Sequence, residues 1–199
     1  MTRSPAARRP LALALLFVLG GAVGWYASFE LAVAKFAVLT DPTTDTGCNF
    51  SLIVQCGKNL DSWQGAVFGF PNPLLGVAGF IVPIVVGVAM LAGARFARWF
   101  WIAFTAGIAT AFAFVVWLMS QSIFALGTLC PWCMVVWAVV IPLFWAVVLD
   151  ALSSGTVPLP RRSRAFFRAA TGWVPLLTIA SYAVVAVIAQ LRLDVLSYL

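Results

Sequence analysis

The sequence predicts an all-α integral membrane protein, built as a four-helix transmembrane bundle with a fifth transmembrane helix. Three observations lead to this fold class. Of the 199 residues, 63% are hydrophobic and only 9% are charged, whereas soluble domains carry about 25% charged residues. The mean hydropathy is +1.05. Five stretches also come close to, or exceed, the roughly 20 apolar residues that cross a bilayer core.

The predicted spans follow one another along the chain at residues 11–39, 74–94, 99–119, 131–149 and 173–191. The first is longer than one crossing and carries Glu30 and Lys35, so we expect residues 30–39 to continue as an amphipathic turn or two above the membrane. The basic N-terminus resembles a signal peptide. Its apolar run exceeds the roughly 7–15 residues of a signal peptide, and Trp25 and Tyr26 replace a small-residue cleavage site, which favours a retained span.

The basic residues predict the orientation, because cytoplasmic loops carry an excess of lysine and arginine. If the spans alternate in direction, nine of the twelve basic residues lie on one face of the membrane, and only Lys35, Lys58 and Arg192 lie on the opposite face. We therefore expect a multi-pass membrane protein with its N-terminus in the cytoplasm. The nine are Arg3, Arg8, Arg9, Arg95, Arg98, Arg161, Arg162, Arg164 and Arg168.

The predicted organisation has four parts. Residues 1–10 form a cytoplasmic segment, and residues 11–151 form the catalytic core with an extracytoplasmic loop at 40–73 and a short turn at 120–130. Residues 152–170 form a basic cytoplasmic linker, and residues 171–199 form the fifth helix and tail. The basic residues lie in short segments between apolar runs, not in a patch with exposed aromatic residues, so nucleic-acid binding is not expected.

Four cysteines form two pairs, and both pairs fall on the outer face. Cys48 and Cys56 lie in the 40–73 loop, and Cys130 and Cys133 form a C-x-x-C at the outer end of the fourth span. Disulfides persist in such a compartment, and a C-x-x-C dithiol exchanges easily with a second pair. The chain has no histidine, so its chemistry depends on thiols, carboxylates or a bound cofactor. The pairs predict an electron relay between thiols and a membrane-soluble partner.

The start of the fourth span suits a reactive dithiol. Pro131 fits the first helical turn, which places both sulfur atoms near the helix N-terminus, where a thiolate is favoured. Met134 and Trp137 continue inward at helical spacing, an arrangement that suits a flat, lipid-soluble redox partner such as a quinone. The alternatives are that Met134 and Trp137 are ordinary core, that the C-x-x-C is a structural disulfide, or that the four cysteines bind zinc.

The outer loop supplies the second half of the relay. Its glycines suggest a segment mobile enough to bring one cysteine onto the C-x-x-C and the other to a soluble partner, although a structural clip is the alternative. Asn72 precedes Pro73 at the entry to the second span. It is either an N-cap or an amide that points into the bundle and donates a hydrogen bond to a carbonyl.

The motifs together resemble the vitamin K epoxide reductase (VKOR) family in its bacterial form, over roughly residues 10–150. They are Cys48-x7-Cys56, Ser62 six residues later, Asn72-Pro73-Leu74-Leu75-Gly76 at a helix start, and Cys130-Pro131-Trp132-Cys133. The resemblance implies a four-helix bundle around a quinone, either menaquinone or ubiquinone. It implies that Cys48 exchanges with a thioredoxin-fold protein, that Cys56 links transiently to Cys130, and that Cys133 faces the quinone.

Further roles follow from the same resemblance. Asn72 matches an asparagine that contacts a quinone oxygen, and Ser62 matches a hydroxyl residue associated with the active-site cysteines. Trp137 stands where many animal members have tyrosine, and its indole offers only an N–H donor. Many bacterial relatives carry a fused thioredoxin-like domain, which this sequence lacks, so the expected thiol partner is a separate protein.

The resulting hypothesis is a quinone-dependent thiol oxidase that reoxidises a DsbA-like protein outside the membrane, supporting disulfide formation. The DsbB family does similar work, but its C-x-x-C precedes the loosely spaced pair, the reverse of this chain. The alternatives are a quinone epoxide reductase, a transmembrane thiol transporter and a non-catalytic membrane scaffold clipped by two disulfides.

Overall fold

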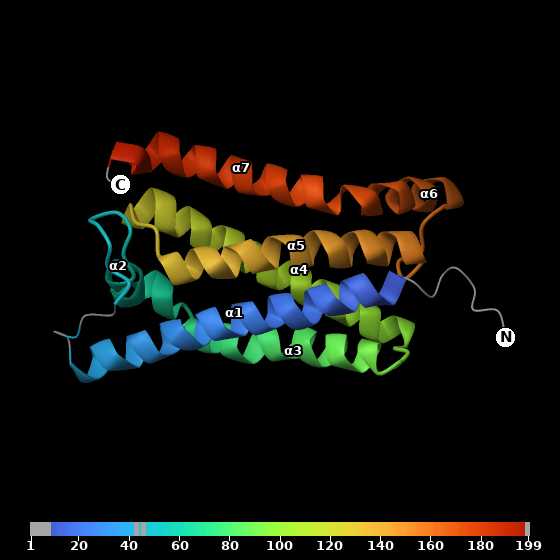
Figure 1. Ribbon diagram of the computed structural model, residues 1–199, viewed down its shortest axis with the longest axis horizontal. Coiled ribbons are helices and arrows are strands. Elements are labelled where there is room, and N and C mark those ends of the chain that lie inside the picture. Colours follow the sequence, from blue (N-terminus) through green and yellow to red (C-terminus); the bar gives the residue numbers. More distant parts are fainter. Residues whose placement is uncertain (1–8, 42–43, 45–46, 198–199) are drawn as a thin grey trace.

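A computed structural model describes residues 9–41, 44 and 47–197, and its long helices run side by side as a bundle (Figure 1). They are α1 (Arg9–Thr40), α3 (Pro73–Leu91), α4 (Arg98–Ser120), α5 (Pro131–Ser154) and α7 (Val174–Leu193), with the short helices α2 (Gly57–Asp61) and α6 (Arg161–Ala170). Within this described part, five segments are long and apolar enough to cross a membrane. The predicted all-α membrane fold, four helices and a fifth, is confirmed.

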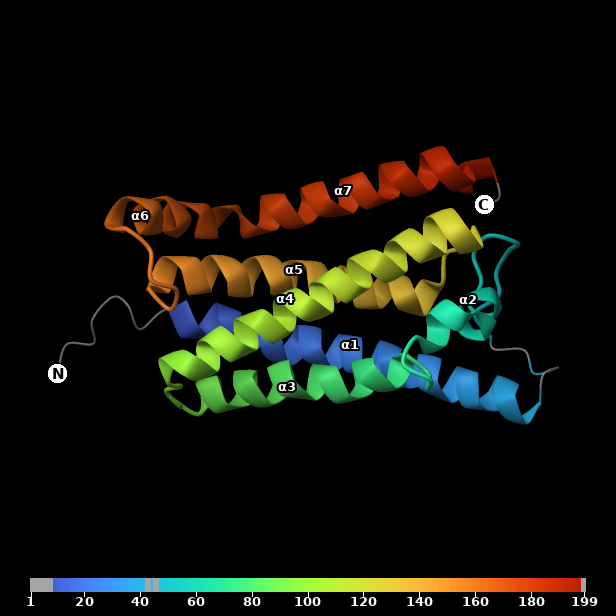
Figure 2. The same ribbon diagram turned by 180° about the vertical axis from the view of Figure 1, so that it is seen from behind.

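The two ends of the bundle carry different parts of the chain (Figures 1 and 2). The start of α1, the connection between α3 and α4, and the arginine-rich helix α6 lie at one end. Helix α2, with the cysteine loop, and the end of α7 lie at the other. The basic segments and the cysteine loop therefore occupy opposite ends, as the sequence predicts. Most of the predicted N-terminal segment, including Arg3 and Arg8, lies outside the described residues.

Helices α1 and α3 pack closely because glycines line their contact. A Cβ atom added at Gly87 would lie 2.8 Å from the carbonyl oxygen of Ala14 and 2.9 Å from Cβ of Phe17. A Cβ atom added at Gly76 would lie 2.8 Å from Cβ of Ser28. Small residues let membrane helices approach each other, and van der Waals contact then holds them together in place of a hydrophobic driving force.

The fifth helix is fastened to α5 at a proline. Pro142 lies inside α5 and has no N–H, so it leaves the carbonyl of Ala138, four residues earlier, without that helical donor. The hydroxyl of Tyr182 in α7 donates a hydrogen bond to this carbonyl oxygen. Nearby, Nε1 of Trp145 donates to Oγ of Ser181 at 3.1 Å. Two polar contacts thus join α7 to an otherwise apolar surface.

Two segments that the sequence predicts to be irregular are partly helical. The expected turn at 120–130 begins with a π-helical segment, Gln121–Leu126, that continues α4 and ends where Gly127 adopts a φ of 66°. The expected linker at 152–170 contains α6, which carries four arginines, three of them in its first four residues. Neither helical segment contains a glycine or proline that would interrupt its main-chain hydrogen bonds. The first segment ends at Gly127.

The outer end of α1 remains helical to Thr40, as expected for residues 30–39. There Nζ of Lys35 pairs with Oδ1 of Asp61 at 3.3 Å, joining α1 to α2. Asp61 is largely exposed, so water screens the pair and its contribution to stability is small. Its main effect is to locate α2, which directly follows Cys56, beside α1.

Candidate active site

A short β-bridge holds the cysteine loop against the start of α5. Val54 and Leu129 form a parallel bridge. The main-chain N–H of Gln55 donates to the carbonyl of Leu129 at 3.0 Å, and the N–H of Leu129 donates to the carbonyl of Ile53 at 2.7 Å. Because Cys56 follows Gln55 and Cys130 follows Leu129, this pairing brings the two cysteines together.

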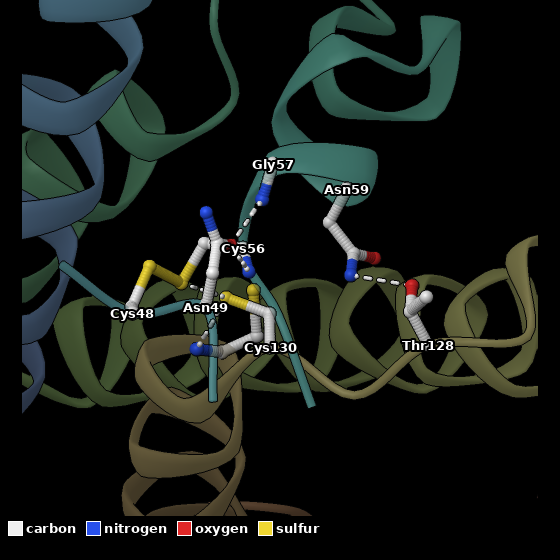
Figure 3. Close-up of a disulfide and its surroundings, with 8 residues drawn as sticks. Cys48, Asn49, Cys56, Gly57, Asn59, Thr128 and Cys130 are labelled. Carbon is white, nitrogen blue, oxygen red and sulfur yellow. Dashed lines mark hydrogen bonds between the residues drawn. A yellow bond between two sulfur atoms is a disulfide. The ribbon is translucent and has the colours of Figure 1, made fainter. Parts of the chain in front are cut away.

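Side-chain hydrogen bonds reinforce this contact (Figure 3). Nδ2 of Asn59 donates to Oγ1 of Thr128 at 2.9 Å, and the side chain of Thr128 is fully buried. On the loop itself, Oδ1 of Asn49 accepts from the N–H of Cys56 at 3.2 Å and from that of Gly57 at 3.5 Å. The backbone around Cys56 is therefore fixed on both sides.

Three of the four predicted catalytic sulfur atoms lie next to one another (Figure 3). Cys48 and Cys56 form a disulfide, whereas Cys130 and Cys133 are free thiols. Sγ of Cys130 lies 3.4 Å from Sγ of Cys56. Cys48, Cys56 and Cys130 are each no more than 3% exposed. Among the described residues, no group of three or more His, Cys, Asp or Glu could hold a metal ion.

The surroundings of Cys130 favour its thiolate. The side chain of Cys133 donates a hydrogen bond that lowers the pKa of Cys130, and the main-chain N–H groups of Cys133 and Trp132 lower it further, against the opposing effect of burial. Sγ of Cys130 also caps α5 by accepting from the N–H of Cys133 at 3.5 Å. A thiolate at the start of a helix is the nucleophile that disulfide exchange needs.

A cavity of 690 Å³ lies within the bundle on the other side of the C-x-x-C. Its walls come from α1, α3, α4 and α5, and residues 59–65 cover its outer end. The deeper wall is apolar, with Phe80, Phe104 and Leu143. Volume and composition are those of a small-molecule site, typically about 300–1,000 Å³. The polar lining residues belong to the outer end: Ser28, Asn59, Ser62, Gln64, Asn72, Gln121 and Ser122.

One face of α5 forms a wall of this cavity. Cys133, Val136, Trp137 and Val140 all line it, at the i, i+3, i+4, i+7 spacing of a single helical stripe. Trp137 is 7% exposed and lies one turn deeper than Cys133. A flat, apolar ligand in the cavity would contact both the sulfur atom and the indole ring.

The prediction that Met134 shares this wall is wrong. Met134 lines a second cavity of 450 Å³ between α5 and α7, together with Tyr182. Successive residues on an α-helix differ by about 100°, and Met134 lies on the side of Cys133 that is turned toward α7 and away from the first cavity. The spacing of four residues from Cys130 placed Met134 on the face of Cys130, which is not the face that lines the first cavity.

Asn72 lines the cavity and occupies the N-cap position of α3, but its side chain makes no capping hydrogen bond. Its Oδ1 accepts from the N–H of Val67 at 3.1 Å, and its Nδ2 donates to the carbonyl oxygen of Gln64 at 2.6 Å. Asn72 thus stands at the N-cap position, as one alternative predicts, but its amide binds the preceding segment and not the first N–H groups of α3. Asn72 instead holds the 3₁₀ helix η2 (Trp63–Ala66), which covers the outer end of the cavity.

Ser62 also lines the cavity and shapes the same turn. Its Oγ accepts from the N–H of Gly65 at 3.2 Å, which caps η2, and donates to the carbonyl of Asn59 at 2.8 Å. Ser62 thus connects α2, which follows Cys56, to η2.

Five polar residues of the cavity are not predicted from the sequence, and two of them, Gln64 and Gln121, contact each other. Nε2 of Gln64 donates to Oε1 of Gln121 at 3.4 Å, and the side chain of Gln64 is 8% exposed. Gln64 lies in the four-residue 3₁₀ helix η2, which is too short for a sequence periodicity to indicate which way the side chain points. The available signal was Gln121, a polar residue directly after a long apolar span and close to the C-x-x-C.

Comparison with known proteins gives one match. The model of a family described as the vitamin K epoxide reductase family matches residues 15–148. This region contains all four cysteines, runs from α1 to near the end of α5, and leaves out α6 and α7. No curated protein and no solved structure gives a significant match.

Proposed function

Because this chain belongs to the vitamin K epoxide reductase family, which implies a membrane quinone-linked disulfide oxidoreductase, we propose that it oxidises a separate DsbA-like thioredoxin-fold protein and passes the electrons to quinone. The observation that carries the proposal is the position of the C-x-x-C. Cys130 contacts Cys56 of the loop disulfide at 3.4 Å, while Cys133 lines the 690 Å³ cavity. The dithiol therefore connects the loop to the cavity.

The first exchange oxidises the partner. A thiolate of the reduced partner attacks Sγ of Cys48, and Cys56 leaves as a thiolate. The partner's second cysteine then attacks the mixed disulfide and releases Cys48. The partner leaves with one disulfide, and the loop holds two thiols, so two electrons and two protons have moved to the chain. Cys48 is 3% exposed, so partner access requires the loop around it to shift.

The second exchange is internal. The Cys56 thiolate attacks Sγ of Cys130 in a Cys130–Cys133 disulfide, and Cys133 leaves as a thiolate. The Cys48 thiolate then attacks Sγ of Cys56 and displaces Cys130. Cys130 is a good leaving group because its pKa is lowered. The result is a loop disulfide with thiols at Cys130 and Cys133, which is the pairing of the cysteines in the structure.

The last step regenerates the C-x-x-C disulfide. A bound quinone, menaquinone or ubiquinone, would accept the two electrons and two protons of this dithiol. The cavity fits such a ring, because it is apolar in depth, polar at its outer end and open to the sulfur of Cys133. Cys133 would contact the ring, Trp137 would stack against it, and the surrounding side chains would exclude water. Cys130 would bond to Cys133 as the electrons leave.

We place the cysteine loop outside the bacterial inner membrane. Cys130 and Cys133 are free thiols, which disfavours a non-catalytic scaffold that is held together by two disulfides. Cys56 is bonded to Cys48 and lies 3.4 Å from Cys130, which directly precedes α5, so both cysteine pairs lie at one end of the bundle. This placement disfavours a transporter that carries electrons across the membrane. Reduction of a quinone epoxide by the same dithiol is the remaining alternative.

The test is an anaerobic assay with the purified protein, a reduced DsbA-like protein and a soluble quinone, followed by quinone absorbance. We expect quinone reduction coupled one to one to oxidation of the partner, and its loss in the Cys56→Ala and Cys133→Ala variants, whose folding is checked by circular dichroism. A parallel assay supplies the quinone epoxide. Reduction of the epoxide without reduction of the quinone would instead support the epoxide reductase, and reduction of neither by folded protein would overturn both.

A further inference from the structure

Gln64 contains a buried acceptor that has no partner. Its Oε1 atom makes no hydrogen bond to any of the described residues, and its side chain is 92% buried, being only 8% exposed. The residue lines the 690 Å³ cavity. Buried polar atoms in proteins are nearly always hydrogen-bonded, because an unpaired one loses its contact with water without replacement. This atom therefore indicates a ligand that brings a donor.

The remaining polar atoms of Gln64 are used to hold it in place. Its Nε2 donates to Oε1 of Gln121 at 3.4 Å, which orients the amide with its oxygen free. Its main-chain carbonyl accepts from Nδ2 of Asn72 at 2.6 Å. The 3₁₀ helix η2 that carries Gln64 is capped by Ser62. The acceptor is thus fixed in the polar outer end of the cavity.

We propose that Oε1 of Gln64 accepts a hydrogen bond from the hydroxyl of a quinol in this cavity, so that the site binds quinol more tightly than quinone. This inference rests on the proposed function. The oxygens of a quinone are acceptors only and cannot pair with Oε1, whereas each hydroxyl of a quinol is a donor. Gln64 therefore distinguishes the reduced ligand from the oxidised one.

Asn72 has a different role in this arrangement from the one that the family resemblance implies. Both ends of its amide bind the segment 64–67. Asn72 is a positioning residue that acts through Gln64, and Gln64 is the ligand contact.

The preference assists the direction of the reaction. In a thermodynamic cycle, the ratio of the Kd for quinone to the Kd for quinol equals the factor by which the equilibrium constant for reduction is larger for the bound ligand than for the free one. The hydrogen bond to Gln64 thus draws electrons from the Cys130–Cys133 dithiol toward the cavity. It forms as the ligand gains its protons.

The test measures binding instead of turnover. The full chain with Cys133→Ser, which blocks electron transfer, is placed in lipid nanodiscs and titrated with decylubiquinone and with its separately prepared quinol, using quenching of tryptophan fluorescence. We expect Gln64→Leu to raise the Kd for the quinol about five- to tenfold, the effect of one neutral hydrogen bond, and to leave the Kd for the quinone within about twofold. Gln55→Leu, outside the cavity lining, is the matched control and should change neither Kd.

The outcomes separate the inference from the proposed function. If Gln64→Leu changes both dissociation constants equally, changes neither, or weakens the quinone more, the inference is wrong while quinone binding stands. If the parent protein binds neither form, the proposed quinone function fails and the inference fails with it. Thermal unfolding of each variant checks that the fold is kept.

A double-mutant cycle tests the role of Asn72. Asn72→Ala should raise the Kd for the quinol in the parent protein. In the Gln64→Leu background it should have no further effect, because the residue through which it acts has been removed. An additional loss of quinol affinity in that background would mean that Asn72 contacts the ligand directly, and would contradict the positioning role.

Discussion

Sγ of Cys130 lies 3.4 Å from Sγ of Cys56, on the opposite side from the disulfide bond that joins Cys56 to Cys48 (Figure 3). The three sulfur atoms form a chain in which the central one can bond to either neighbour. Exchange between the loop and the C-x-x-C therefore needs no large movement of the helices. The sulfur of Cys48, in contrast, is buried and must be uncovered before a soluble protein can reach it.

The first prediction concerns this contact. A variant with Cys48→Ala and Cys133→Ala retains only Cys56 and Cys130, and we expect it to form a Cys56–Cys130 disulfide under mild oxidation. The control with Cys56→Ala and Cys130→Ala retains Cys48 and Cys133, and should stay mostly as free thiols. Mass spectrometry of proteolytic peptides measures both. Equal cross-linking in the two variants would show that proximity in the fold does not decide the pairing.

The second prediction concerns pH. In a Cys48→Ser, Cys56→Ser background, Cys133→Ser and Cys133→Ala each leave Cys130 as the last cysteine. Serine keeps a side-chain donor toward Cys130, whereas alanine removes the hydrogen bond that contributes most to its lowered pKa. A lowered pKa means that the thiolate persists to lower pH, so the midpoint of alkylation by iodoacetamide should be lower in the serine variant. Identical midpoints would exclude a role for the side chain at 133.

The third prediction concerns the contact between α1 and α3. Gly87→Ala should lower the free energy of unfolding by about 1–3 kcal/mol, the usual cost of overpacking, because the added methyl group meets main-chain and Cβ atoms of α1 at under 3 Å. Gly79→Ala in the same helix meets nothing within 4 Å and should be neutral or slightly stabilising, since alanine favours helix. Denaturation in mixed micelles measures both, and similar losses in the two variants would argue against close packing at Gly87.

The fourth prediction concerns the attachment of α7. Tyr182→Phe removes the donor to the carbonyl of Ala138 and should cost about 0.6 kcal/mol, the average for hydrogen bonds between membrane helices. In a Pro142→Ala background the same change should cost less, because the restored N–H at position 142 supplies the carbonyl with a helical donor. The two unfolding measurements should therefore be non-additive. Strict additivity would mean that Tyr182 does not compensate for the proline.

The sequence predicted the spans well because their signal is local. About 20 consecutive apolar residues indicate a membrane crossing, whichever helices pack against that segment. Arginines in the loops distinguish the two ends of the bundle, and they too can be recognised without knowledge of the packing. The Cys130–Cys133 pair at a helix start follows from Pro131. Each of these inferences needs only a short window of the chain.

The features that the sequence did not predict depend on contacts between distant segments. The direction of Gln64 is fixed by Asn72 and Gln121, from two other parts of the chain. Met134 has the helical spacing of a stripe that begins at Cys130, but the stripe that faces the cavity begins at Cys133. Helical periodicity gives the angle between residues but not which face meets a cavity, and that is decided only when the helices pack.

The bridge between Val54 and Leu129 joins the loop to α5 through main-chain atoms alone. The alignment of Cys56 with Cys130 therefore depends little on the partly exposed side chains at positions 53–55, provided that none becomes proline where an N–H is used, whereas Leu129 is also held by its buried side chain. Substitutions at positions 53–55 could accumulate, for instance to suit a different lipid or partner, without disconnecting the sulfur atoms. Inserting one residue between the bridge and either cysteine would separate them, because it shifts the register while leaving every existing side chain intact.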